Sequence, residues 1–113
     1  MSNKIYSFLG LATRAGKVLS GEETCERAIR SGKAYLVIVS EDASENTKKK
    51  FRDMCTYRKV QLRVFGQKEF LGRYTGKEIR AVVVITEEGF GKRLIELMNG
   101  TDLEHGGGQY GEV

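Results

Sequence analysis

The sequence predicts an α/β protein in which helices are layered on a small four-stranded sheet. Three observations indicate this class. Apolar residues alternate along the chain between helical spacing and short β-prone runs, which is typical of alternating helices and strands. The 113 residues have the size of one domain, and a hydrophobic content of 40% is enough for one modest core. The complete absence of proline fits regular elements that are joined by short turns.

The first part of the chain predicts two helices and two strands. Residues 5–12 carry apolar side chains at helical spacing and form the first helix. Residues 17–20, KVLS, form a short strand. The second helix begins at Gly21 and ends near residue 32, where a glycine suits the position after a helix. Residues 35–40, YLVIVS, are a continuous apolar run, which predicts a strand covered on both faces.

The rest of the chain predicts three further helices and two further strands. The third helix begins at Ser44, and its inner positions are expected to be Phe51, Met54, Cys55 and the aliphatic stem of Arg58. The later elements are a strand at 60–65, a short helix within 66–76, a buried strand at 80–86 and a helix at 88–100. Residues 1–100 are therefore expected to form one domain, followed by a flexible glycine-rich tail at 101–113.

The charge balance favours a polyanion as partner. The chain has 19 Lys and Arg against 15 Asp and Glu, a formal net charge of +4 and a pI near 9.1. Simple solubility is the alternative explanation. No run approaches the ~18 apolar residues of a membrane span, and the N-terminus lacks a secretion signal. We therefore expect a cytoplasmic protein with no membrane partner.

The sequence gives little support for an enzyme. Phosphate-binding, dinucleotide-binding, hydrolase and metalloprotease motifs are absent. Glu41 and Asp42 follow a predicted strand and fit a solvated turn better than an acid–base pair. Cys25 and Cys55 are expected to be small buried groups, and His105 has no zinc-like spacing to either. We expect no catalytic residue, no metal and no cofactor.

Basic residues form two groups along the chain. The first comprises Arg14, Lys17, Arg27, Lys77 and Arg80, which are expected to gather at one end of the sheet as a phosphate footprint, without Arg30. The alternative is an ordinary charged surface, because Glu23–Arg27 and Glu26–Arg30 have the i,i+4 spacing of helix-stabilising pairs.

The second basic group is denser and lies in residues 47–63, TKKKFRDMCTYRKVQLR. Lys48, Lys49 and Lys50 cannot all face one way on a helix, because successive residues are about 100° apart. This group is therefore interpreted mainly as a solvated face, with nucleic-acid contact as the alternative.

The start of the second helix combines features of a nucleic-acid contact. A helix N-terminus offers free N–H groups and a positive dipole end. Gly21 lacks a Cβ, so a nucleic-acid backbone could approach closely. Glu22 and Glu23 stabilise the dipole, and carboxylates also accept hydrogen bonds from base amino groups. We therefore expect this junction to read bases while neighbouring cations hold phosphates.

Two segments carry a resemblance to a known family. GKVLSGEETCERAIRSGKAYLVIVSEDAS and FLGRYTGKEIRAVVVIT resemble the ribosomal protein L7Ae family of RNA-binding proteins, most closely its bacterial YlxQ-type branch. The resemblance covers nearly the whole chain. It implies a three-layer α/β/α sandwich with a small mixed four-stranded sheet and, as in many relatives, recognition of kink-turn or related internal-loop RNA.

The resemblance also implies a set of RNA-binding residues. In many relatives a loop reading Gly-Ala-Asn-Glu-x-Thr-Lys enters the groove at tandem G·A pairs, and a second loop covers an extruded base. The first four positions fall at Gly21, Glu22, Glu23 and Thr24, and the family lysine falls at Arg27. The second loop falls at Gly76, Lys77, Glu78 and Ile79, with Ile79 as its apolar member.

The expected partner is structured RNA, in particular ribosomal RNA, together with ribosomal or translation proteins; no DNA is expected. Two other functions remain open. The same fold serves protein-interaction adaptors, and it supplies substrate-recognition domains of RNA methyltransferases. The basic charge argues against the adaptor, and a methyltransferase would need a separate catalytic domain.

Overall fold

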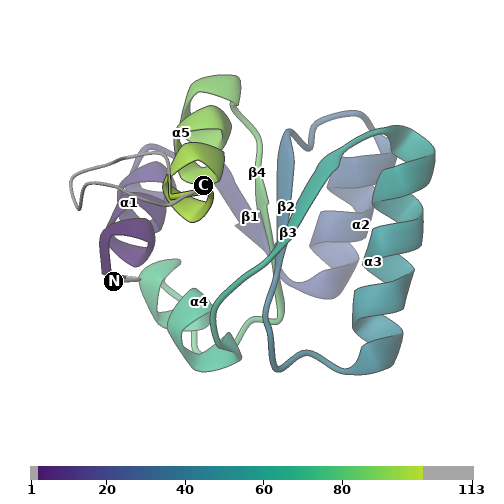
Figure 1. Ribbon diagram of the computed structural model, residues 1–113, viewed down its shortest axis with the longest axis horizontal. Coiled ribbons are helices and arrows are strands. Elements are labelled where there is room, and N and C mark those ends of the chain that lie inside the picture. The colour runs from purple at the N-terminus through teal and green to yellow at the C-terminus, as the bar shows by residue number, and fades with distance from the viewer. Residues whose placement is uncertain (1–2, 101–113) are drawn as a thin grey trace.

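The computed structural model describes residues 3–100 and contains the predicted alternation of helices and strands (Figure 1). The elements are α1 (Asn3–Arg14), β1 (Val18–Ser20), α2 (Glu22–Arg30), β2 (Leu36–Val39), α3 (Glu45–Arg58), β3 (Gln61–Val64), α4 (Lys68–Tyr74), β4 (Val82–Ile85) and α5 (Glu88–Met98). Each element predicted from the sequence is present at its expected place. The predicted tail, 101–113, lies outside the described residues.

The strands form one mixed sheet with the order β1-β4-β2-β3. β2 and β3 are parallel, whereas β4 is antiparallel to both β1 and β2. Ser20 is opposite Val83, and Val39 is opposite Val82. The ends of β1, β2 and β3 therefore lie beside the start of β4, and we call this end of the sheet the Gly21 end.

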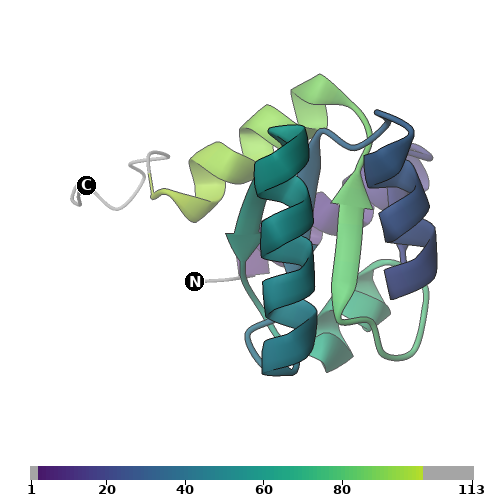
Figure 2. The same ribbon diagram turned by 90° about the vertical axis from the view of Figure 1, so that its right-hand side faces the viewer.

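Helices cover both faces of the sheet, which confirms the predicted α/β/α sandwich (Figure 1). Helices α1, α4 and α5 pack on one face, and α2 and α3 pack side by side on the other (Figure 2). All residues of β2 and β4 are buried, as the apolar runs predict for strands covered on both faces. β3 is an edge strand and is partly exposed.

The inner positions of helix α3 differ from the prediction at one residue. Ser44 is its N-cap, and Phe51 and Cys55 are buried, as predicted, while Met54 is partly buried. The aliphatic stem of Arg58 is not an inner position. Arg58 is exposed, and its guanidinium Nη1 donates to the carbonyl oxygen at the end of α2, at 3.1 Å.

Both cysteines are buried and unpaired. Burial raises the pKa of the Cys25 thiol to about 12 and that of the Cys55 thiol to about 11. Both thiols are therefore protonated at neutral pH and act as small packing groups. Within residues 3–100, no group of acidic, histidine and cysteine side chains could hold a metal ion, and no helix is long and apolar enough to cross a membrane.

Candidate nucleic-acid interface

Gly21 links the end of β1 to the start of α2 in a conformation that favours glycine. Its φ of 97° and ψ of 145° lie in a region that L side chains rarely adopt. The Gly21 N–H donates to the Val82 carbonyl at 3.0 Å, which fixes the junction to the start of β4. Within residues 3–100, and leaving out the two neighbours of Gly21, the only heavy atom within 4 Å of a Cβ built at Gly21 would be Arg80 Nε. The backbone is therefore open to a close approach.

Within the described part of the chain, no side chain caps the N–H groups in the first turn of α2. The other helices with described N-termini differ, because each has a side-chain acceptor: Ser44 Oγ for Thr47 N–H in α3, Asp42 Oδ1 for Lys68 N–H in α4, and Glu87 Oε1 for Phe90 N–H in α5. Gly21 has no side chain to play this part. Helix α2 thus presents free donors and the positive end of its dipole at the Gly21 end.

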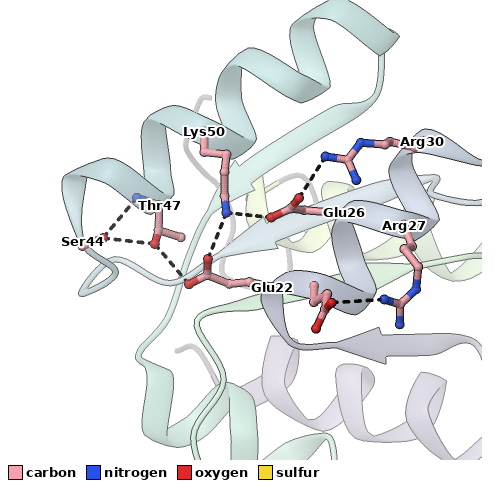
Figure 3. A network of polar contacts seen from close by, with 8 residues as sticks. Glu22, Glu26, Arg27, Arg30, Ser44, Thr47 and Lys50 are labelled. Atoms are coloured by element: carbon pink, nitrogen blue, oxygen red, sulfur yellow. Dashed lines mark hydrogen bonds and ion pairs between the residues drawn. The ribbon is translucent and has the colours of Figure 1, made fainter.

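Glu22 is directed away from this helix end and towards α3 (Figure 3). Its Oε2 accepts a hydrogen bond from Thr47 Oγ at 3.2 Å, and its Oε1 lies 3.4 Å from Lys50 Nζ. Lys50 also contacts Glu26 at 2.6 Å. The hydrogen bond from Lys50 lowers the pKa of Glu26, and the same bond raises the pKa of Lys50. We call Glu22, Glu26 and Lys50 the clamp between the two helices.

The base contact predicted for the Glu22 carboxylate from the chemistry of the helix N-terminus conflicts with its position, because that carboxylate is already bound by α3. Glu23 is free of the clamp and 91% exposed, and it pairs with Arg27 at 3.8 Å. The predicted i,i+4 pair of Glu26 and Arg30 is also present, at 3.0 Å. The exposed side chain of Glu23 is thus the acidic group that a ligand at this helix end would meet.

A groove of about 550 Å³ lies between β1 and α2. Thr24 and Arg27 line it, as do Leu19, Arg30 and Lys33. Arg30 is the last residue of α2 and lines the part of this groove away from the Gly21 end, so it lies apart from that end as predicted although it shares the groove with Arg27. We call this feature the β1–α2 groove; it begins beside the open end of α2.

Arg80 brings a distant loop to the junction. Its Nε donates to Ser20 Oγ at 3.2 Å, and its Nη1 donates to the Ile79 carbonyl at 2.8 Å. Ile79 is 60% exposed although it is apolar. The loop packs directly on α4, since a Cβ at Gly72 would collide with the Glu78 carbonyl. Two segments that are far apart in the sequence therefore form one surface.

Lys77 and Glu78 belong to the same loop and are exposed. The Lys77 N–H donates to the Gly72 carbonyl at 2.8 Å, so the loop backbone is held while both side chains face solvent. We use the name junction edge for Ser20, Gly21, the first turn of α2, Ile79 and Arg80.

The structure does not bring all five predicted cations together. Lys17 lies at the opposite end of the sheet, where its carbonyl accepts from the Thr86 N–H at 3.0 Å. Arg14 lines a groove between α1 and α5. The predicted clustering is wrong for these two residues, because β1 and β4 are antiparallel and the start of one strand lies beside the end of the other.

Sequence reasoning missed three residues that the structure places here: Ser20, Leu19 and Lys33. Ser20 accepts a hydrogen bond from Arg80. Its position directly before Gly21 could have indicated from the sequence that it belongs to this site. Leu19 is 36% exposed on an edge strand, whereas a short apolar run predicts burial. Lys33 lies beyond the end of α2, and only the return of the chain towards β2 brings it to the groove.

The fold and this edge define a known class of protein. Residues 3–95 match the model of the ribosomal protein L7Ae/L30e/S12e/Gadd45 family, and the chain belongs to this family.

Similar proteins and structures agree with this assignment. The chain is 47% identical over 94 residues to the RNA-binding protein YlxQ of Bacillus subtilis (strain 168), covering 83% of this chain and 94% of that protein. It is 43% identical over 98 residues to the RNA-binding protein YlxQ of Enterococcus faecium, covering 86% and 93%.

Two solved structures are also similar. A protein of unknown function from Bacillus halodurans C has a TM-score of 0.81 at 41% identity, covering 84% of this chain and 96% of that one. A 15.5 kD RNA-binding protein of Giardia lamblia has a TM-score of 0.72 at 20% identity, covering 89% and 87%, and this likeness concerns the fold alone.

Proposed function

We propose that the protein binds structured RNA through the junction edge and acts in association with the ribosome or translation. The observation that carries this proposal is the uncapped N-terminus of α2 beside Arg80. Free N–H groups, a helix dipole and a guanidinium are all donors that suit a phosphate or a base edge. The two similar YlxQ proteins are RNA-binding proteins by name, which supports RNA as the partner.

The loop that precedes β4 provides the second half of the proposed site. Exposed Ile79 offers an apolar surface on which an extruded base could pack, and Arg80 lies directly beside it. Lys77 adds a positive charge in the same loop. A ligand with an extruded base next to a bent phosphate backbone, such as an internal-loop or kink-turn-like RNA, fits this combination.

Glu23 and Thr24 set the base preference in this proposal. A glutamate accepts hydrogen bonds but cannot donate them, unlike an asparagine amide. The exposed Glu23 carboxylate therefore favours base amino or imino donors and disfavours acceptors and phosphates. Thr24, which is partly buried beside the groove, offers a hydroxyl that donates or accepts.

Two binding experiments test this proposal. Crosslinking the protein to RNA in cells, followed by sequencing, should recover structured ribosomal segments. In vitro, a hairpin with an internal loop of tandem G·A pairs should bind more tightly than a matched hairpin with a continuous stem. If no RNA is recovered above background and a protein copurifies instead, the adaptor function replaces this one.

A further inference from the structure

The second basic group of the sequence is only partly neutralised in the structure. Its three consecutive lysines are all paired: Lys48 with Glu45 at 3.7 Å, Lys49 with Asp53 at 2.8 Å, and Lys50 in the clamp. Arg52, Lys59 and Arg63 have no carboxylate within 4.0 Å among residues 3–100. The uncompensated charge therefore lies on residues other than the lysine run.

These three cations line one groove of about 420 Å³ between α3 and β3. The rest of the lining is neutral and includes Thr56 and Gln61. Lys59 alone would mean little, because a cation after the last turn of a helix complements the helix dipole. Arg52 lies almost two turns earlier and Arg63 lies on β3, so the dipole does not explain them. We call this feature the α3–β3 groove.

Arg63 is held in place within the α3–β3 groove. Its Nη1 donates to Gln61 Oε1 and to the Leu62 carbonyl, both at 3.0 Å. β3 is the edge of the sheet, so the outer side of its backbone has no strand partner within the described residues (Figure 2). A fixed guanidinium at a free strand edge is suited to phosphate oxygens, because these accept hydrogen bonds from guanidinium N–H groups and from backbone N–H groups.

The two grooves are joined across the ends of α2 and α3. Arg30 and Lys33 line the far part of the β1–α2 groove. Arg58 Nη1 donates to the Arg30 carbonyl at 3.1 Å, which sets a guanidinium between the two helix ends. Lys59, the next residue, already lines the α3–β3 groove. Cations therefore continue from one edge of the sheet to the other.

We propose that the α3–β3 groove binds the phosphodiester backbone of a second, single-stranded segment of the same RNA. The inference rests on the proposed function and adds to it, because the junction edge lies at the opposite edge of the sheet. The structured element occupies the junction edge. The flanking strand then passes over Arg30 and Arg58 to Arg52, Lys59 and Arg63.

The test compares two RNA probes and four protein variants. The short probe is the hairpin with tandem G·A pairs; the long probe adds a single-stranded tail of about ten nucleotides, within the range that one groove binds. Arg52→Gln/Lys59→Gln removes two charges from the α3–β3 groove. Lys48→Gln/Lys49→Gln is the matched control, since it removes two charges from the same helix but outside the groove. Arg80→Gln reports on the junction edge.

The wild-type protein should bind the long probe roughly tenfold more tightly than the short one. Arg52→Gln/Lys59→Gln should abolish this gain, and the slope of log affinity against log salt should fall by about 1.4 for the long probe, 0.7 for each lost single-strand contact. Neither double variant should change binding of the short probe more than about twofold. Thermal unfolding of each variant confirms that the fold is kept, and Arg63→Gln provides a second groove variant.

The outcomes separate the two proposals. If the control costs as much affinity for the long probe as the groove variant, or if the tail gives no gain, the second contact is wrong while the junction edge stands. If the groove variant weakens both probes equally, the groove belongs to the first contact, and this inference is also overturned. If Arg80→Gln leaves both affinities unchanged, the proposed function itself fails at this edge.

Discussion

The N-termini of α2 and α3 lie side by side and are built in opposite ways (Figure 3). In α3, the Ser44 hydroxyl caps the helix by accepting from the Thr47 N–H at 3.1 Å. In α2, Gly21 gives no cap, and the nearest carboxylate, that of Glu22, is bound by Thr47 and Lys50. The start of α3 therefore has one of its first-turn N–H groups held by a side chain. The start of α2 has none held in this way, so all of its first-turn donors are open to a ligand.

The largest effect is expected from Arg80→Gln, which removes the cation beside the open helix end. Among residues 3–100, the Arg80 side chain donates to the Ser20 hydroxyl and the Ile79 carbonyl, and the variant keeps the backbone bond to the Lys68 carbonyl, so the fold should persist. A lost charge-assisted contact should lower the affinity for the internal-loop hairpin by roughly tenfold or more. Filter binding measures this, with thermal unfolding as the check on the fold. An unchanged affinity would remove Arg80 from the binding surface.

Arg27→Ala should have a smaller effect, about fivefold, because Arg27 is exposed, lies one turn further along α2 and already pairs with Glu23. The slope of log affinity against log salt concentration should become less steep by about 1, which corresponds to the loss of one phosphate contact. Glu23→Gln is the control for loss of the pair. It should bind RNA as well as the wild-type protein or better, since it removes repulsion and restores an amide donor. Weaker binding of Glu23→Gln would show that the carboxylate itself reads the RNA.

Lys50→Met opens the clamp and tests whether Glu22 must be held away from the ligand. Freed carboxylates near the α2 N-terminus should weaken RNA binding about threefold. Glu22→Gln in the same protein should restore the affinity, because the carboxylate nearest the start of α2 is then neutral, while Glu26 keeps its pair with Arg30. Equal weakening in the single and double variants would contradict this role for the clamp.

The clamp also predicts a pH dependence of stability. Lys50 lowers the pKa of Glu26, so the stabilisation is present above the unfolded-state pKa of a glutamate and is lost as the pH falls through the folded-state value. Lys50→Met should therefore reduce the free energy of unfolding at neutral pH by less than about 1 kcal/mol, and the loss should vanish in acid. Urea unfolding of both proteins at several acidic and neutral pH values measures the difference. A constant difference at every pH would contradict it.

Ser44→Ala should have the smallest effect on RNA affinity and a clear effect on the stability of the fold. Removing the cap of α3 should lower the free energy of unfolding by about 1 kcal/mol. RNA affinity of the folded protein should stay within about twofold of wild type, because Ser44 caps α3, lies outside the junction edge and carries no charge. A large loss of affinity at constant stability would place the ligand on α3 instead.

The fold was readable from the sequence because its strongest signals are local. The buried runs of β2 and β4, the serine cap of α3 and the glycine at the start of α2 each fix an element without reference to distant residues. The direction of each strand in the sheet could not be predicted from such local signals. Arg14 and Lys17 were misplaced since the antiparallel pairing of β1 with β4 depends on the whole sheet.

The candidate site was readable only in part. Gly21 and Arg80 were identified and meet in the structure. The binding of Glu22 by α3 could not be foreseen, because Thr47 and Lys50 are distant in sequence and reach it only through helix packing. The φ of Gly21 also makes Gly21→Val a poor probe of RNA contact, since backbone strain would add to any steric effect.

The most direct test of the open helix end is an NMR titration of the ¹⁵N-labelled protein with the internal-loop hairpin. The amide signals of Glu22, Glu23 and Thr24 should shift on addition of RNA, because their N–H groups have no acceptor among residues 3–100. The Thr47 amide, which the Ser44 hydroxyl already holds, should keep its position. Shifts at Thr47 with none at the start of α2 would contradict the account.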